Sequence, residues 1–187
     1  MKRFFETITQ LSPLQADAAD AFAAVVKTQT LPKGHLLIKA GTICNYIYFI
    51  EEGLSRTFYY KEGKDVTDWI SAEGSFAASV VSFITRQTDI RNVELLETSV
   101  ICAVSYNDLE QLYSRYHEIE RLGRLLVSFG LVQLQQRFDD LHFASAQKRY
   151  MKLMNTQPDL INRVPLGMIA SYLGITQETL SRIRAKI

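Results

Sequence analysis

The sequence predicts an α+β protein in which an N-terminal β-roll precedes a long helix and a C-terminal helix-turn-helix. Three observations lead to this prediction. Glycine-punctuated, strand-like runs fill residues 30–105, residues 106–143 show helical spacing without proline, and residues 166–187 fit two short helices joined by a tight turn. We expect three parts, with a β-domain at 1–115, a long helix at 116–144 and a helix-turn-helix domain at 145–187.

The β-roll is predicted from short apolar or alternating runs, which are typical of strands when turn residues separate them. These runs are HLLIKAG, YIYFIEEG, LSRTFYYKEGKD, VTDWISAEG and NVELLETSVICAVS. The segment before them, residues 13–27, is rich in alanine and has apolar positions at helical spacing. We therefore expect one helix ahead of the roll.

Length and composition exclude several classes of protein. With 187 residues, 47% hydrophobic and 22% charged, the chain is globular rather than disordered. It has no apolar run near the roughly 20 residues that span a bilayer, and its first residues do not resemble a signal peptide. Cys44 and Cys102 lie in apolar runs, so we interpret them as buried core residues and expect a cytoplasmic protein.

The charge is unevenly distributed along the chain. Residues 1–145 hold 14 Lys and Arg against 18 Asp and Glu, a net charge of −4. Residues 146–187 hold 7 Lys and Arg against 2 Asp and Glu, a net charge of +5, and the whole chain carries +1. A small basic segment joined to a larger acidic one indicates a nucleic-acid-binding domain attached to a separate domain.

The long helix is predicted to carry a dimer seam. The seam consists of apolar residues at 3-4-3 spacing and one polar residue that would fix the register, namely Ile119, Leu122, Leu126, Phe129 and Gln133. A second apolar set is expected to cover the roll, and it comprises Leu125, Leu131, Val132 and Leu134. The helix either pairs with its copy across a two-fold axis, which we favour, or lies wholly inside one subunit.

The closing stretch, IASYLGITQETLSRIRAKI, fits two helices that bury one shared face. That face comprises Ile169, Leu173, Ile175, Leu180 and Ile183. Gly174 supplies the turn, and Thr176 is a suitable N-cap for the second helix. The residues left to contact DNA are Thr176, Gln177, Glu178, Ser181, Arg182 and Lys186. The alternative is a packed helix pair with a solvated outer face.

These segments resemble the cyclic AMP receptor protein / fumarate-nitrate reductase regulator (Crp–Fnr) family. PLGMIASYLGITQETLSRIRAKI is similar to its winged-helix DNA-binding domain, and KAGTICNYIYFIEEGLSRTFYY is similar to the hairpin of its sensor. The resemblance implies a homodimeric transcription regulator with a cyclic-nucleotide-binding-like sensor, bound to palindromic double-stranded DNA. It also implies base contacts by Glu178 and Arg182, while Gln177 replaces an arginine of the family's recognition segment.

The family's phosphate cassette departs from its pattern in this chain. In FAASVVSFITRQTDIRNV, Ala78 and Ser79 stand in place of Gly-Glu, and Asp89-Ile90 stands in place of Arg-Ser. A carboxylate at Asp89 would repel a cyclic phosphate, so we expect no cyclic AMP binding. Arg86 and Arg91 either hold a different anion or are solvated. The predicted ligand pocket comprises Phe76, Ala78, Ser79, Asp89 and Arg91.

No cofactor, metal site or enzyme activity is predicted. Two scattered cysteines are too few for an iron–sulfur cluster, and His35, His117 and His142 show no paired spacing for a haem or a metal. No catalytic constellation stands out. The leading interpretation is a DNA-binding transcription regulator with an unknown small-molecule effector or none. The alternative is a small-molecule-binding module with a structural helix-turn-helix. Whether a wing follows Ile187 stays open.

Overall fold

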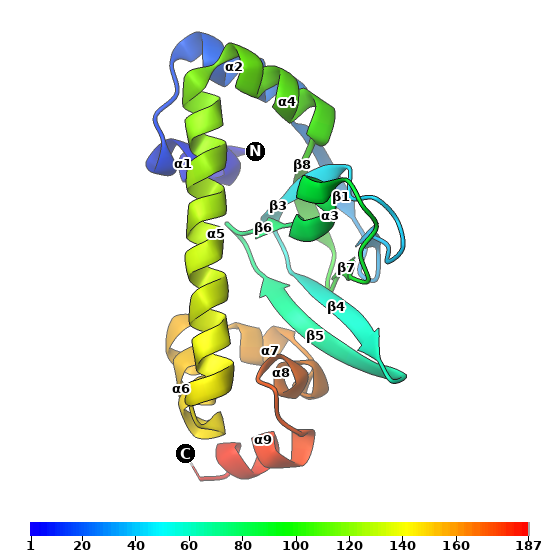
Figure 1. Ribbon diagram of the computed structural model, residues 1–187. Coiled ribbons are helices and arrows are strands. Elements are labelled where there is room, and N and C mark those ends of the chain that lie inside the picture. Colours follow the sequence, from blue (N-terminus) through cyan, green and yellow to red (C-terminus); the bar gives the residue numbers. More distant parts are fainter. Residues whose placement is uncertain (187) are drawn as a thin grey trace.

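A computed structural model describes residues 1–186, so the last residue of the predicted helix-turn-helix domain, 187, lies outside the described residues. Figure 1 shows the long helix α5 along one side, the roll beside its upper and middle parts, and helices α6 to α9 at its lower end. The helices span Lys2–Leu11 (α1), Ala16–Val25 (α2), Val80–Thr85 (α3), Tyr106–Arg115 (α4), His117–Phe143 (α5), Ala146–Thr156 (α6), Leu160–Arg163 (α7), Leu166–Tyr172 (α8) and Gln177–Arg184 (α9).

The roll consists of two antiparallel four-stranded sheets, ordered β1-β8-β3-β6 and β2-β7-β4-β5. The strands span Lys27–Leu31 (β1), Leu36–Ile38 (β2), Tyr46–Glu52 (β3), Ser55–Lys61 (β4), Lys64–Ser71 (β5), Phe76–Ala77 (β6), Asn92–Leu95 (β7) and Ser99–Ser105 (β8). Each predicted run contains at least one strand. Strand β1 begins at Lys27, where the predicted helix 13–27 was expected to end. The sequence did not indicate this strand, because KTQTL is mostly polar and exposed and shows no apolar alternation.

Helix α1 was not expected from the sequence, yet it is part of the roll's core. Phe4 and Ile8 are fully buried, and the Phe4 ring meets the Phe49 and Phe76 rings edge-on at centroid distances of 5.3 and 6.3 Å. The Glu51 carboxylate accepts hydrogen bonds from two backbone N–H groups in the first turn of α1, at 2.8 and 3.0 Å. A buried acid thus satisfies the start of a helix that has no side-chain cap of its own.

The helical stretch 106–143 is two helices, because Tyr116 adopts an extended conformation with φ −129° and ψ 102°. The second helix, α5, lies within the range 116–144 that was expected for the long helix. The chain turns there, and α4 packs back against α5. A Cβ atom at Gly123 would lie 2.5 Å from the Tyr113 hydroxyl oxygen, so glycine is what permits this close approach. The break leaves α5 as a separate helix of 27 residues.

The apolar side chains of α5 that pack in the core of the roll all lie in the first half of the helix. Ile119 and Leu122 belong to the roll's core, Leu126 is half-buried against it, and Phe129 and Gln133 are exposed. The predicted seam is therefore wrong in its first half, since those residues are covered within one chain. The prediction that the second apolar set covers the roll is also wrong for three members, which are 53–67% exposed: Leu131, Val132 and Leu134.

Helices α6 to α9 share a second apolar cluster with the roll. The face predicted for the closing helices is confirmed, because Ile169, Leu173 and Leu180 are buried and the other two members pack beside them. Helix α7 is a single short helix between α6 and α8. Within residues 1–186 no strand follows β8, so the wing of the predicted fold is not among them. Over that range, no helix is both long and apolar enough to cross a membrane.

Because α1 contributes two of the most buried side chains, we expect its removal from the core to destabilise the whole roll. Ile8→Ala should lower the free energy of unfolding by about 2–5 kcal/mol, through lost burial and the cavity left behind. The matched control Ile90→Ala removes the same atoms from a side chain that is 63% exposed, and it should change stability by less than about 0.5 kcal/mol. Urea denaturation measures both; equal effects would contradict a core role for α1.

Candidate functional site

The turn between α8 and α9 holds the two helices at a fixed angle. Leu173 and Leu180 are 2% and 0% exposed, and they pack in one cluster. Gly174 adopts φ +64°, a backbone conformation that residues with a side chain rarely adopt. A Cβ atom there would also lie 3.1 Å from the Leu141 side chain on α5. The turn is therefore shaped both by its own backbone and by its contact with the long helix.

The start of α9 is capped as the sequence predicts. The Thr176 hydroxyl accepts a hydrogen bond from the backbone N–H of Thr179 at 3.2 Å. At Glu178, the backbone N–H and the Thr176 hydroxyl lower the pKa of the carboxyl group, and the nearby Arg182 cation lowers it further. Glu178 is thus an ionised hydrogen-bond acceptor in the first turn. Arg182 donates weakly to the Thr179 hydroxyl at 3.3 Å and leaves its other donors free for a ligand.

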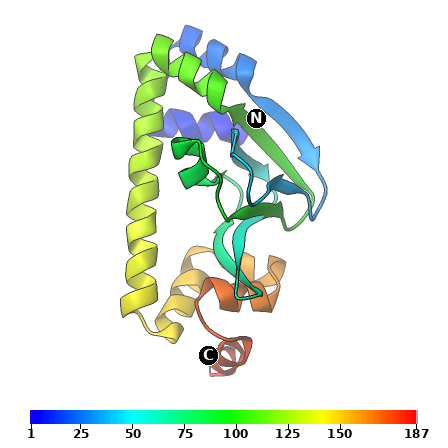
Figure 2. The same ribbon diagram turned by 45° about the vertical axis from the view of Figure 1, so that its right-hand side comes forward.

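All six residues predicted to contact DNA are exposed, and they lie on α9 or at its two ends: Thr176, Gln177, Glu178, Ser181, Arg182 and Lys186. Figures 1 and 2 both place α9 at the end of the molecule, with the roll on the far side of α8. Arg184, which is not among the residues predicted to contact DNA, is also exposed in the last turn. The result is a protruding helix with acceptors at its start and cations toward its end.

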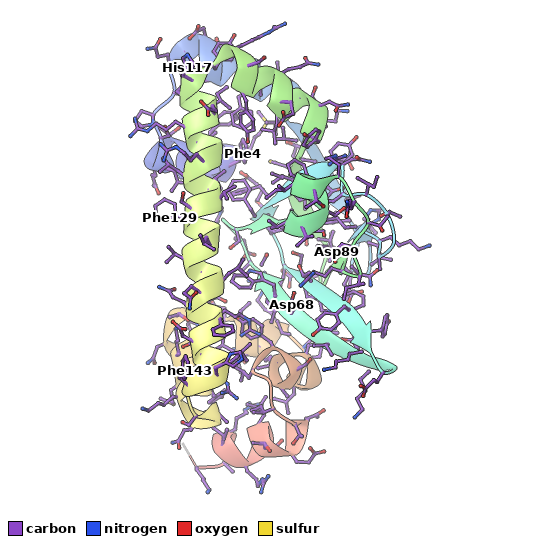
Figure 3. The ribbon with its side chains drawn as sticks, viewed as in Figure 1. Phe4, Asp68, Asp89, His117, Phe129 and Phe143 are labelled. Carbon is purple, nitrogen blue, oxygen red and sulfur yellow. The ribbon has the colours of Figure 1, made fainter. Side chains whose placement is uncertain are left out.

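The cassette between β6 and β7 is occupied by a network of the chain's own charges. Ser79 donates its hydroxyl to Asp89 at 2.6 Å, and Arg91 Nη1 donates to both Asp89 oxygens at 3.1 and 3.2 Å. Arg91 Nε also donates to Asp68 on β5 at 2.8 Å, a partner that the sequence did not indicate. Figure 3 shows Asp68 and Asp89 near each other on the roll. One arginine between two carboxylates leaves this network with a net negative charge.

The electrostatics of the cassette favour an ionised Asp89. Burial alone would raise the pKa of this carboxyl group, but hydrogen bonds from Ser79 and the Ile90 N–H, together with the Arg91 cation, lower it. Arg86 is not part of the network. Its Nη1 donates to the Cys44 carbonyl oxygen at 2.7 Å and its guanidinium lies over the Tyr106 ring. Of the two alternatives for these arginines, simple solvation does not hold, because protein acceptors bind both.

The remaining predicted pocket residues do not point to a shared ligand site. The Phe76 ring packs against α1 and β3 in the core, and Ala78 is half-buried against the same cluster.

The two cysteines are buried, and both are free thiols. Among residues 1–186, no three His, Cys, Asp or Glu side chains are grouped so that they could hold a metal ion.

The chain is similar to known regulators along most of its length. Residues 28–116 match the cyclic nucleotide-binding domain family. The fumarate and nitrate reduction regulatory protein of Vibrio cholerae is 26% identical over 172 residues, covering 85% of this chain and 68% of the relative.

Two solved structures share the fold. The c-di-GMP responsive regulator CLP of Xanthomonas campestris has a TM-score of 0.71 at 16% identity, covering 92% of this chain and 91% of its own. A structure described as a Crp/Fnr-family regulator from Eubacterium rectale has a TM-score of 0.72 at 13% identity, covering 92% and 83%.

The domain match identifies the roll, and the two structures show the same overall fold, in which a long helix follows the roll and a helix-turn-helix lies at its end. The similarity to the relative from Vibrio cholerae extends over 85% of this chain. Over most of its length, the chain is therefore similar to regulators of the Crp–Fnr family.

Proposed function

We propose that the protein is a non-enzymatic transcription regulator that binds palindromic DNA as a homodimer through two copies of α9. The observation that carries this proposal is the exposed polar face of α9, which stands on a capped, well-packed helix pair. Such a helix enters the major groove with its N-terminal residues toward the base edges. A protein that binds chromosomal DNA works where the DNA is, so we place it in the cytoplasm.

Local charge supports the same proposal. The segment 146–187 carries a net charge of +5 although the whole chain carries +1. Arginine donates two hydrogen bonds to guanine O6 and N7, and glutamate accepts from the amino group of cytosine. Arg182 and Glu178 are exposed on one side of α9, four residues apart, so they are suited to neighbouring base pairs. The acidic remainder of the chain limits non-specific binding without reaching this face.

The dimer contact we propose is a stripe on the exposed side of α5. It consists of residues at 4-3-4-3 spacing that are 38–67% exposed: Val127, Leu131, Leu134, Phe138 and Leu141. This spacing is the repeat that lets two parallel helices pack knobs into holes, and a two-fold axis would pair the stripe with itself. The stripe replaces the predicted seam, half of which is covered by the chain's own roll. It also sets the two α9 helices on the same side of the dimer.

The sensor is proposed to function without a cyclic nucleotide. The carboxylate of Asp89 and the Ser79 hydroxyl bind each other where the family's ligand phosphate would be expected, and Arg91 is shared by two acids. An incoming phosphate would have to displace Asp89 from Arg91 while lying beside an ionised carboxylate. The charge arrangement therefore disfavours an anionic ligand in this cassette.

Arg182→Ala is predicted to weaken binding to the preferred operator by about 1–3 kcal/mol per half-site, because a bidentate contact to guanine is lost. On an operator changed at that base pair, the same substitution should cost little. Lys186→Ala, which removes a cation at the end of α9, should weaken both operators alike and reduce the salt dependence. Fluorescence anisotropy at two salt concentrations measures this. If Arg182→Ala weakened both operators equally, Arg182 would be a phosphate contact only.

Leu131→Glu should dissociate the dimer, because two carboxylates would be buried against each other at the stripe. The side chain is 67% exposed in the single chain, so the monomer should stay folded. Leu36→Glu is the matched control, since Leu36 is 43% exposed on the roll, away from the stripe. Sedimentation velocity measures the oligomeric state of both variants. If the Leu131→Glu protein were still fully dimeric, the stripe would be ruled out as the interface.

Cyclic AMP and cyclic GMP are predicted not to bind tightly, since the cassette presents Ser79 and Asp89 to the phosphate. Titration calorimetry should show no saturable heat at ligand concentrations of about 100 μM, where a micromolar site would be nearly filled. A dissociation constant of about 1 μM or lower for either nucleotide would contradict this part of the proposal.

A further inference from the structure

The DNA-binding helices are packed on the roll of their own chain. One apolar cluster joins Leu54, Ile70 and Leu96 of the roll to α6, α7, α8 and α9. Helix α8 lies against β5, and the backbone N–H of Thr67 on β5 donates to the Ser171 hydroxyl on α8 at 2.9 Å. Figure 2 shows the β4–β5 hairpin reaching down to α8. None of these residues belongs to the exposed face of α9.

A single guanidinium at the edge of this interface binds two turns of the roll. Arg163, the last residue of α7, donates through Nη2 and Nη1 to the two Glu73 oxygens at 2.6 and 3.0 Å. It also donates to Glu97, from Nη2 at 2.5 Å and from Nε at 3.3 Å. Glu73 lies between β5 and β6, and Glu97 lies between β7 and β8. We call these three residues the Arg163 cluster.

The Arg163 cluster has the properties of a fixed contact rather than a transient surface pair. The side chains of Arg163 and Glu73 are 26% and 25% exposed, and Glu73 also accepts the backbone N–H of Gly53 at 2.9 Å. Burial alone would raise the pKa of Glu73, but the hydrogen bonds from Arg163 and the backbone lower it to about 2. Fork-to-fork pairing of arginine with carboxylates sets direction as well as strength. It therefore resists rotation of α7 on the roll.

This contact helps to orient α9, together with Arg137 on α5, which donates to the Tyr172 carbonyl oxygen on α8. The DNA-binding helices leave α5 through Ala144, an extended residue between α5 and α6. Two residues separate Arg163 from α8, and α8 and α9 form one packed unit around Leu180. Holding the end of α7 on the roll thus holds α9 at one angle to α5, and α5 carries the proposed dimer contact. In the dimer, that angle sets the distance between the two α9 helices.

We infer that Arg163 is a positioning residue for DNA recognition: by binding Glu73 and Glu97 it fixes the distance between the two recognition helices and so selects the spacing of the half-sites. The inference rests on the proposed function, because it requires a dimer that binds paired half-sites. The Arg163 cluster contacts no DNA itself. It acts on which operators are accepted, through the angle of α9.

The test uses the full chain and inverted repeats whose half-site spacing is changed one base pair at a time. Dimers of this kind place half-sites about 10 base pairs apart, so the wild-type protein should prefer one spacing by about tenfold over spacings two base pairs away. Arg163→Gln should reduce that preference to less than about threefold. Arg115→Gln removes one exposed cation on α4, far from the cluster, and should keep the wild-type preference.

Charge exchange separates positioning from simple loss of stability. Arg163→Glu combined with Glu73→Arg rebuilds the pair in reverse and should restore most of the spacing preference. If Arg163→Gln does not fold, Glu97→Gln, which keeps the Glu73 pair, should show a smaller loss of preference. A folded Arg163→Gln protein with the wild-type preference would overturn the inference, even at a lower melting temperature. If the wild-type protein bound no inverted repeat better than random DNA, the proposed function itself would fail.

Discussion

The contact between α8 and β5 holds the helix pair that carries the DNA-facing helix on the roll. Thr67 and Ser171 join the two elements by a hydrogen bond, and a shared apolar cluster fills the space behind them. Arg163 closes the edge of this contact with two carboxylates from separate turns of the roll. The roll therefore binds the DNA-binding helices through apolar, hydrogen-bonded and charged contacts. It is the surface on which their orientation is set, and a change in the roll can reach α9 through it.

In the cassette, hydrogen bonds and ion pairs among polar and charged side chains hold the structure, rather than an apolar cluster. In Asp68, Arg91, Asp89 and Ser79 the chain supplies both the cation and its anions, so the site is satisfied without a ligand. Arg91 binds Asp68 on β5, the same strand that carries Thr67 and contacts α8. The cassette and the DNA-binding helices thus meet on one strand. In this chain an internal ion pair occupies the region that, in the family resemblance, belongs to a phosphate.

The sequence predicted the local structure correctly where each residue type has a single physical reason to stand at its position. Gly174, Thr176 and the apolar face around Leu180 predicted the helix-turn-helix, because turn, cap and periodicity agree there. The core role of α1 depends on Glu51, which lies far away in the chain and caps its first turn, so no local pattern revealed it. The predicted seam failed at Ile119 and Leu122 because helical spacing gives a face but not its partner. Asp68 and Glu73 were missed for the same reason, since their cations lie 23 and 90 residues away.

The central claim is that α9 recognises a specific inverted repeat while the roll holds it in place. Selection of bound fragments from a random DNA pool, followed by sequencing, tests this claim most directly. We expect enrichment of two inverted half-sites about one helical turn apart, each with a conserved G·C pair that Arg182→Ala no longer selects. Enrichment of a single unpaired site, or of the same repeat by the wild-type and Arg182→Ala proteins, would contradict it.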